Sequence, residues 1–289
     1  MAAVINALLD IQKIKTLTNE FDYPLKGPGM MWQAFKEYVE QRGGRVLLNS
    51  KINRVRHVNG SIVIIDYMND NQTRELELEH LISSMPVPEL VSILEPRPPD
   101  KVIAAANRLS YRAFIIVILI LNKKDVFRDQ WVYIHSPDVR VGRIQNFRNW
   151  SKDMVPDPDK TSIGMEYFCN KGDDIWRMAD DDLIDMASGE LSRIGLAELS
   201  DIIDGYVARQ PDAYPVYDDE YKENLAIVKE YLRDIKNLQT IGRGGTHRYN
   251  NMDHSMLTAM RAVENIINGI TSKDNIWAVN TEEEYHEGK

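Results

Sequence analysis

One short stretch in the last quarter of the chain is rich in glycine and arginine, residue types that can bind an anion. The stretch reads IGRGGTHRYNNMDHS from position 241, and the residues concerned are Gly242, Arg243, Gly244, Gly245 and Arg248. The glycines let a backbone come close to a bulky ligand, and the arginines supply positive charge beside it. The same residue types also suit a plain loop before a helix cap, so the stretch alone leaves both interpretations open.

A helix is predicted directly after this stretch. Asp253 and Ser255 are placed to cap its first turn. Its apolar stripe has helical spacing and consists of Met256, Met260, Val263 and Ile267. A glycine loop that leads into a helix N-terminus favours an anion, because free N–H groups and the helix dipole both attract negative charge.

The composition limits the classes of ligand and partner. The chain has 289 residues, 43% hydrophobic and 27% charged, with a net charge of −9. This suits a soluble globular protein of one large or two medium domains. Because nucleic acids and anionic membranes both need a basic protein face, we expect neither as a partner. An anionic small molecule needs only a pocket with local arginines.

Metal and membrane signals are absent from the sequence pattern. Cys169 is the only cysteine, which excludes an intrachain disulfide and fits a cytoplasmic protein. No HxH or HExxH pair occurs among the six histidines, so no metal site is predicted. The longest apolar run, from 113 to 121, is too short for a membrane-spanning helix, which needs about 20 residues.

The first hundred residues predict helices and short strands. Met31, Phe35 and Tyr38 share one face of a helix that stops at Gly43-Gly44. Asn59-Gly60 is a strong signal for the turn of a hairpin. The remaining predictions are a helix over 2–15 and strands over 45–48, 52–58, 61–67, 73–79 (half exposed) and 81–85.

The middle of the chain predicts a second, mainly antiparallel sheet. The apolar run from 113 to 121 is typical of a central strand. The acidic segment 173–190 is interpreted as a helix with a solvated face rather than as a cation site. Tyr214-Pro215 is expected to form a rigid corner. Further strands are predicted over 131–134, 141–147, 162–169, 206–209 and 238–241, and further helices over 100–109 and 219–233.

This order of elements predicts an α/β fold with an inserted α+β domain built on an antiparallel sheet. The outer parts of the chain are expected to belong together. The predicted domains are 1–105, 106–237 and 238–289, with the last segment returning to the first domain.

The residues quoted so far resemble a known family. GRGGTHRYNNMDHS, followed by AVENI at 262–266, resembles the C-terminal flavin motif of UDP-galactopyranose mutases, which belong with the amine-oxidase and protoporphyrinogen-oxidase flavoproteins. PLKGPGMMW at 24–32, GGRVLLN at 43–49 and LISSMP at 81–86 match the order of elements in that superfamily's Rossmann-like FAD domain. WVY at 131–133, Gly142-Arg143, NWS at 149–151 and Tyr214-Pro215 look like the mutase substrate domain. The likeness covers roughly residues 23–287.

The resemblance implies roles for individual residues. Arg243 and the neighbouring glycines would face the FAD pyrophosphate. The residues implied for the flavin ring and its helix are Asn251, Met252, Asp253 and Ser255. Arg143 would hold a substrate diphosphate, and Trp131 would pack on the uridine or the sugar. The other residues implied for the substrate are Tyr133, Tyr214, Arg248 and Tyr249. No side chain is assigned to the catalytic step, which the flavin would carry.

One part of the family pattern is missing. No strand–GxGxxG–helix unit occurs in the chain, so the sequence predicts either a C-terminal portion of a flavoprotein or a remnant that does not bind FAD alone. Exposed strand edges would then need another chain, a self-associated dimer or a rearranged edge to cover them. Three functions stay open: a mutase that acts on a nucleotide sugar such as a UDP-sugar through reduced flavin, an amine-oxidase-type FAD oxidoreductase, and a non-catalytic subunit.

Overall fold

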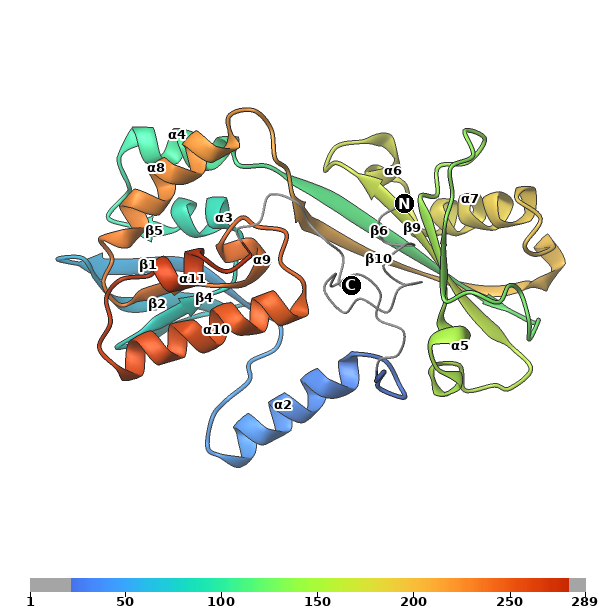
Figure 1. Ribbon diagram of the computed structural model, residues 1–289, viewed down its shortest axis with the longest axis horizontal. Coiled ribbons are helices and arrows are strands. Elements are labelled where there is room, and N and C mark those ends of the chain that lie inside the picture. Colours follow the sequence, from blue (N-terminus) through green and yellow to red (C-terminus); the bar gives the residue numbers. More distant parts are fainter. Residues whose placement is uncertain (1–21, 281–289) are drawn as a thin grey trace, which may run out of the picture.

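The computed structural model describes residues 22–280, so the helix predicted over 2–15 lies outside the described residues. Figure 1 shows two parts joined by two long strands, β6 and β10. β6 spans Tyr111–Leu121 and β10 spans Ile202–Pro215, and they pair antiparallel along most of their length. The predicted mixed α/β class is confirmed, with three separate sheets in the described part of the chain.

The first part contains a four-stranded sheet in the order β3-β2-β1-β5. Its strands are β1 (Ser50–Val58), β2 (Ser61–Asn69), β3 (Gln72–Glu77) and β5 (Leu94–Glu95). The predicted hairpin is confirmed, because Asn59 and Gly60 connect β1 to β2 with positive φ angles of 52° and 73°.

One strand prediction in this part is wrong, and another is right about the strand but wrong about its exposure. No strand forms over 45–48, because Gly43 and Asn49 turn the chain on either side with left-handed φ angles of 83° and 53°. The strand predicted as half exposed is instead exposed at every residue of β3, which lies at the edge of its sheet.

The first hydrophobic core lies between this sheet and the helices α3 (Val87–Ser92), α4 (Asp100–Arg108) and α8 (Tyr221–Arg233). α8 falls within the range 106–237 that the sequence analysis gives to the substrate domain. Its Val228 and Leu232 nevertheless pack in this first core. Next to the core, β4 (Leu81–Ser83) and β11 (Leu238–Thr240) form a parallel two-stranded sheet.

The second part is built on a five-stranded antiparallel sheet in the order β10-β6-β9-β8-β7. The shorter strands are β7 (Trp131–Tyr133), β8 (Arg143–Asn146) and β9 (Thr161–Cys169). Alternate residues of β6, beginning with Ala113 and Ile115, enter a core that α7 (Asp180–Arg193) covers from one side. The strand predicted over 206–209 is therefore only the middle of β10, and Tyr214-Pro215 ends that strand rather than forming a free corner.

The acidic segment forms two helices instead of the single one predicted. α6 (Asp174–Arg177) and α7 are separated by Met178 and Ala179, whose backbones are extended. Asp174 pairs with Arg140, and Asp180 pairs with Arg209 at the surface. Within residues 22–280, no group of three or more histidine, cysteine or acidic side chains is arranged to hold a metal ion.

The last elements are helical. α9 (Gly242–Gly245) is a single helical turn where the sequence predicts a loop, and α10 spans Met252–Ile267. Because α10 begins at Met252, Asp253 and Ser255 lie inside its first turn and not at the cap position. The other short elements are α5 (Phe147–Trp150), the 3-10 turns η1 (Lys152–Met154) and η2 (Leu199–Asp201), and α11 (Asp274–Trp277). None of the described helices has the length and hydropathy to cross a membrane.

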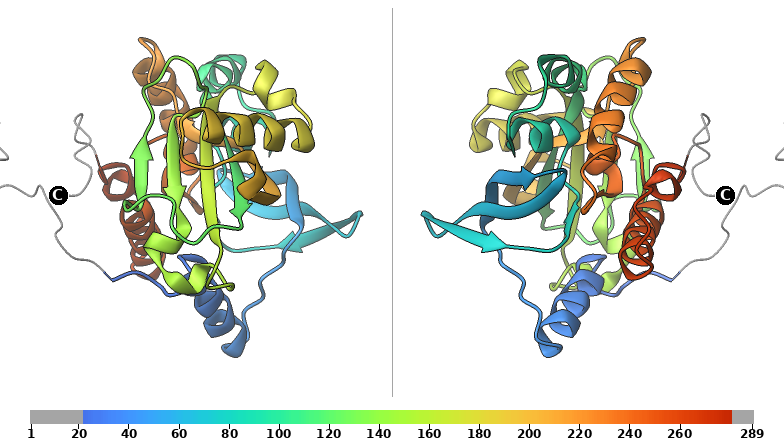
Figure 2. Two further views of the ribbon diagram at one scale, coloured as in Figure 1. Left: turned by 90° about the vertical axis from the view of Figure 1, so that its right-hand side faces the viewer. Right: turned by 90° about the vertical axis from the view of Figure 1, so that its left-hand side faces the viewer.

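The apolar stripe of α10 does not enter a core. The buried residues of α10 are Thr258, Ala262 and Asn265, while Met260 and Ile267 are 59% and 76% exposed. α2 (Gly29–Gln41) has no buried residue at all, and Figure 2 shows it standing away from the sheets. Apolar periodicity thus predicts both helices correctly but not the side that each one buries.

Candidate functional site

The face of the five-stranded sheet opposite α7 carries the short helix α5 near one end, where Phe147 lies against Gly164, and charged and aromatic side chains gather on the rest of it. Strand pairing sets Tyr133 of β7 beside Arg143 of β8, and Arg143 beside Glu166 of β9. Directly opposed residues of neighbouring strands point to the same face of a sheet. The row Tyr133–Arg143–Glu166 therefore follows from the register of three strands.

Arg143 is paired with a buried carboxylate. Its Nε donates to Glu166 Oε2 at 2.5 Å, and Gln145 donates to the other carboxylate oxygen. Glu166 is 1% exposed, so this pair lies largely out of water. Burial lowers the pKa of Arg143, but the hydrogen bond and the negative charge of Glu166 outweigh it and raise that pKa. Arg143 stays charged, and Glu166 balances its charge.

An aromatic cluster continues from this row toward the glycine–arginine stretch. Phe114 of β6 lies 5.6 Å from Phe168 of β9 and 6.2 Å from Tyr214 of β10, measured between ring centroids. Tyr214 then stacks on Tyr249 at 5.4 Å. This cluster connects the open face of the sheet with the segment between α9 and α10.

Arg243 lies against the two stacked tyrosines. Its guanidinium carbon is 5.0 Å from the ring centroid of Tyr214 and 4.8 Å from that of Tyr249, within the range of cation–π attraction. Its Nε and Nη1 donate to the carbonyls of Asn250 and Ala213, both at 2.9 Å. These bonds fix the side chain and use two of the five N–H donors of a guanidinium. The geometry thus groups Arg243 with the residues implied for the substrate.

Gly242, Gly244 and Gly245 are each needed at their positions, for different physical reasons. Gly242 has a left-handed φ of 69°. A Cβ on Gly244 would lie 2.7 Å from the carbonyl oxygen of Ser84, and one on Gly245 would lie 2.7 Å from that of Ser83. The close approach is therefore between α9 and the segment that follows β4. Tyr111 holds α9 from the other side by donating to the Gly244 carbonyl at 2.9 Å.

Arg248 points away from this cluster. Its Nη1 donates to the carbonyl of Asn280 at 2.7 Å, and Asn280 donates back to the carbonyl of Tyr249 at 3.0 Å. Tyr217 accepts the backbone N–H of Tyr249 at 2.7 Å. Within residues 22–280, neither Arg243 nor Arg248 forms an ion pair with a carboxylate. Of the two, Arg243 is the one that lies in the cluster, where its charge can balance an anionic ligand.

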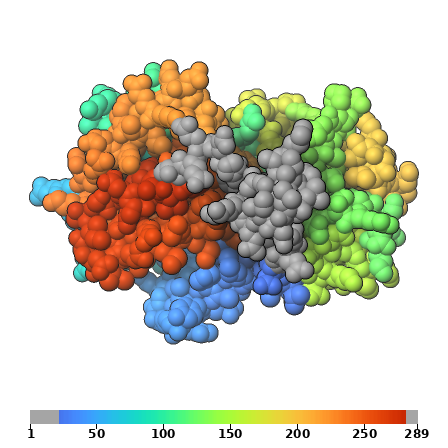
Figure 3. All heavy atoms as spheres, in the orientation of Figure 1, coloured from blue at the N-terminus to red at the C-terminus, as the bar shows by residue number. Residues whose placement is uncertain are grey.

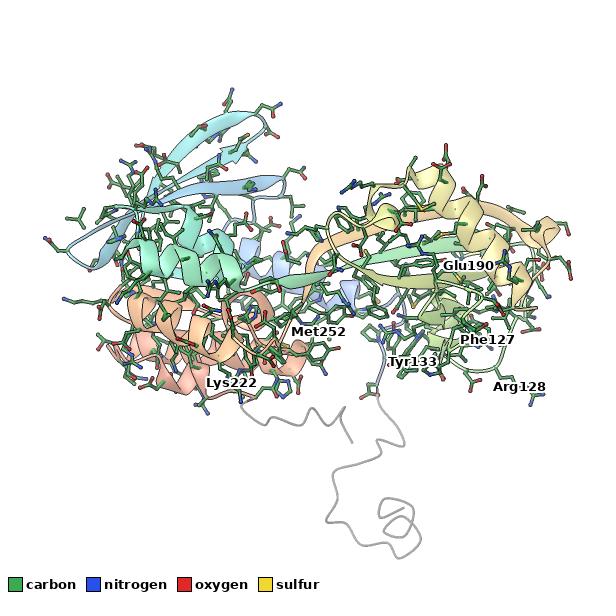
Figure 4. The ribbon with its side chains drawn as sticks, turned by 90° about the horizontal axis from the view of Figure 1, so that it is seen from above. Phe127, Arg128, Tyr133, Glu190, Lys222 and Met252 are labelled. Carbon is green, nitrogen blue, oxygen red and sulfur yellow. The ribbon has the colours of Figure 1, made fainter. Side chains whose placement is uncertain are left out.

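The residues implied for the flavin surround the first turn of α10. Met252 is 47% exposed, and Figure 4 shows it at the end of α10 that faces the part of the molecule carrying Tyr133. Asp253 is exposed, whereas Asn251 and Ser255 are half-buried. Gly242 and Ser255 are neighbours, since a Cβ on Gly242 would lie 3.9 Å from Ser255 Oγ. The first turn of α10 thus adjoins α9.

Trp131 lies in a different aromatic group. It stacks on Trp150 of α5 at 5.1 Å, and Trp150 stacks on Tyr23 at 5.0 Å. Trp131 remains 42% exposed. These three rings attach the segment before α2 to the second part of the molecule, and they leave Trp131 with an accessible surface at the end of the sheet face.

Sequence reasoning missed several residues of this site. Glu166 is hidden in a strand that reads as a buried apolar segment, although a carboxylate within such a strand is itself a signal of a partner. His247 is 1% exposed beside the rings of Tyr111 and Tyr217. Burial lowers its pKa to about 4. Phe114 and Phe168 give no sequence signal that separates them from ordinary core residues.

The three-sheet fold, the glycine turn after a parallel strand and the open sheet face define a class, an α/β cofactor protein with an inserted antiparallel sheet. The chain belongs to the flavin-containing amine oxidoreductase family, whose family model matches residues 12–266. This confirms the resemblance to FAD-dependent amine-oxidase-like flavoproteins. No curated protein sequence matches the chain at a significant level.

Solved structures agree on the fold. The chain is similar to reduced UDP-galactopyranose mutase, with a TM-score of 0.75 and 18% identity over 89% of this chain and 54% of that chain. A putative protoporphyrinogen oxidase from Exiguobacterium sp. 255-15 has a TM-score of 0.56 and 14% identity over 75% and 46%. An oxidoreductase from Methanosarcina mazei has a TM-score of 0.53 and 12% identity over 76% and 49%. The chain therefore spans about half the length of each of these structures.

The residues near α9 fit part of a flavin site. Ser83 and Thr240 pair across β4 and β11, and their buried hydroxyl oxygens have no hydrogen-bond partner among the described residues. Buried polar groups without partners commonly mark a place where a ligand or water completes the bonding. Ligands of parallel sheets bind at the carboxyl ends of the strands, which is where these hydroxyls lie. FAD is therefore a plausible cofactor at this end of the sheet.

Proposed function

We propose that this chain carries the flavin-facing and substrate-facing side of an enzyme that acts on a nucleotide sugar, as UDP-galactopyranose mutase does. The observation that supports this best is Arg243, which lies against Tyr214 and Tyr249 and has no carboxylate partner among residues 22–280. An arginine held in place and flanked by tyrosine rings suits a phosphate group, because its remaining N–H groups can donate charge-assisted hydrogen bonds.

The charge balance of the sheet face favours an anionic ligand over a cationic one. Glu166, a buried carboxylate on this face, is already neutralised by Arg143. Arg243 then leaves the site with an excess of positive charge. A protein with a net charge of −9 can thus hold a diphosphate through a few local groups.

The chain's own residues would bind and orient the substrate. When bound, a reduced flavin supplies a nucleophile for the sugar, with no net oxidation at the end of the reaction. Arg243, Tyr214 and Tyr249 would hold the diphosphate so that the bond to the sugar is presented to the flavin. Trp131, with its exposed ring, would pack on the uridine or the sugar. No described side chain needs to act as a strong acid or base.

An amine-oxidase-type oxidoreductase is the second candidate, and the aromatic cluster of Phe114, Phe168 and Tyr214 favours it. Aromatic faces attract cations, so such a cluster can receive an alkylammonium group. Arg243, however, already occupies the face of Tyr214. An amine would have to compete with this guanidinium, which makes the second candidate the weaker one.

Titration with UDP tests the proposal. We expect the wild-type chain to bind UDP in isothermal titration calorimetry, and Arg243→Met to weaken binding roughly 10- to 100-fold, because one charge-assisted contact is lost. Arg261→Met is the matched control, since Arg261 lies on α10 and pairs with Glu264 at the surface. A folded wild-type chain that ignores UDP, or an Arg243→Met variant that binds it equally well, would exclude this diphosphate site.

A further inference from the structure

A cavity of about 420 Å³ adjoins the second part of the molecule, and none of the residues that line it belongs to the candidate site. Its volume falls within the range typical of sites for small organic ligands, about 300–1,000 Å³. The turn before α2 forms one wall, and α5, η1 and the chain as far as Pro158 form the other. In the space-filling view these two segments, dark blue and yellow-green, lie side by side at the lower edge of the molecule (Figure 3).

Specific contacts hold the two walls together. Tyr23 stacks on Trp150 of α5 with 5.0 Å between the ring centroids, and its hydroxyl donates to Met154 Sδ at 3.7 Å. Gly27 is buried in the same contact, since a Cβ on it would lie 3.2 Å from Met154 Cε. The cavity is therefore a defined feature of the fold.

Three cations and one carboxylate line the cavity, which we call the cationic pocket. The cations are Lys26, Arg148 and Lys152, and the carboxylate is Asp153. None of the three cations forms a salt bridge within residues 22–280. The whole chain carries a net charge of −9, so the pocket has the opposite charge to the protein around it. A cavity lined by one sign of charge concentrates ligands of the other sign, which here means anions.

Asp157, which lies between the two prolines of the pocket wall, does not offset these cations. Its carboxylate forms a salt bridge with Lys160 at 2.9 Å and accepts the backbone N–H of Asp159 at 3.0 Å. The hydrogen bond from Lys160 lowers the pKa of Asp157, and the positive charge of Arg148 acts in the same direction. This acid is therefore already neutralised, and the pocket keeps an excess of positive charge.

The side chains of the pocket suit a phosphate group attached to a hydroxylated molecule. Arg148 Nη1 donates to the carbonyl of Lys160 at 3.2 Å. A guanidinium has five N–H donors, so most of them remain for parallel hydrogen bonds to one oxyanion. A phosphate monoester carries about two negative charges at neutral pH, which Lys26 and Lys152 can help to balance. Asp153 would repel a bare anion, but its carboxylate can accept hydrogen bonds from hydroxyl groups.

We propose that the cationic pocket is a second ligand site, which binds a sugar phosphate or a similar small polyol phosphate. Arg148 holds the phosphate through its N–H fork, Lys26 and Lys152 balance the charge, and Asp153 accepts a hydroxyl hydrogen of the ligand. Because Lys26 lies on the opposite wall from the other three residues, the ligand also ties the turn before α2 to α5. The inference is independent of the proposed function, since no residue of the proposed diphosphate site takes part in it.

Isothermal titration calorimetry of the 289-residue chain with glucose 6-phosphate tests this inference. We expect the wild type to bind it, and Arg148→Met to weaken binding roughly 10- to 100-fold, because charge-assisted hydrogen bonds are lost. Arg128→Met is the matched control, since Arg128 is exposed on the same part, does not line the pocket and points away from the molecule (Figure 4). The control should bind within about twofold of the wild type.

Other probes separate the phosphate from the sugar. Inorganic phosphate should bind at least about tenfold more weakly than glucose 6-phosphate, because it offers no sugar hydroxyl to Asp153. Glucose without the phosphate should not bind. Arg243→Met should leave the binding of glucose 6-phosphate unchanged, which keeps this test separate from the titration with UDP.

Three results would overturn this inference. A folded wild-type chain that ignores glucose 6-phosphate has no such site. Equal weakening by Arg148→Met and Arg128→Met would assign the binding to general attraction by surface charge. Inorganic phosphate that binds as tightly as glucose 6-phosphate would exclude a polyol phosphate as the ligand. Circular dichroism checks the fold of each variant, and if Arg148→Met does not fold, unchanged binding by Lys152→Met would exclude the pocket.

Discussion

Glu166 sets the charge balance of the open sheet face. It is the carboxylate that neutralises Arg143, and strand register places the two side chains directly opposite each other. Without it, Arg143 would be a partly buried cation with no carboxylate partner among the described residues. The pair is therefore interpreted as a structural support that leaves Arg243 as the cation for a ligand.

Glu166→Gln should lower the free energy of unfolding by about 2–3 kcal/mol, because it leaves the Arg143 charge uncompensated in a site that is largely out of water. Urea denaturation followed by circular dichroism measures this change. Glu75→Gln is the control, since Glu75 pairs with Arg56 but its side chain is 61% exposed. That variant should change stability by less than about 1 kcal/mol. Equal effects would show that Glu166 is not the buried partner described.

His247 predicts a pH dependence of stability. Its folded pKa is lowered to about 4 from 6.5 by burial, so the unfolded chain binds the extra proton first as the pH falls. The stabilisation that the folded state gains from keeping His247 neutral is fully present above about pH 6.5. It amounts to roughly 3 kcal/mol of the free energy of unfolding and is lost as the pH falls toward 4. Urea denaturation between pH 7 and pH 4 measures it.

His247→Asn supplies the comparison for that experiment. Asn does not titrate in this range and tolerates the left-handed backbone of this position, where φ is 46°. Between pH 6.5 and 4, the wild type should therefore lose more stability than the variant. Parallel curves for the two proteins would contradict the assignment of a buried neutral histidine.

At the scale of elements, α9 depends on two glycines with no room for a side chain. Gly244→Ala should destabilise the protein by about 1–3 kcal/mol, because its Cβ would lie 2.7 Å from the Ser84 carbonyl oxygen. Gly189→Ala, on α7, meets nothing within 4 Å and should instead stabilise the protein by roughly 0.5–1 kcal/mol. Thermal unfolding distinguishes the two. A tolerated Gly244→Ala would mean that α9 does not pack against β4 as described.

Much of the element order could be predicted from the sequence, but tertiary placement could not. Asn59-Gly60 identifies its hairpin because a two-residue turn has a local chemical requirement. The position of Arg243 against Tyr214 depends on contacts between residues about 30 positions apart, which no local pattern encodes. The stripe of Met260 and Ile267 predicts helix α10 but not which side of it is buried, since Thr258 and Ala262 are buried instead.

At the scale of the whole molecule, each of the two parts supplies different residues to the candidate site. The first part supplies the glycine turn of α9 and the start of α10, and the second part supplies the open sheet face with Arg143 and Tyr133. β6 and β10 hold these surfaces together (Figure 1).

The visible absorbance of the natural protein during addition of UDP and then of a primary amine tests the central claim most directly. If the protein is a nucleotide-sugar flavoenzyme, its flavin bands should shift on addition of UDP, because the proposed diphosphate site at Arg243 would adjoin the flavin. The amine should leave the bands unchanged. A spectrum that ignores UDP and is bleached by the amine under anaerobic conditions would contradict the account and identify an amine oxidoreductase.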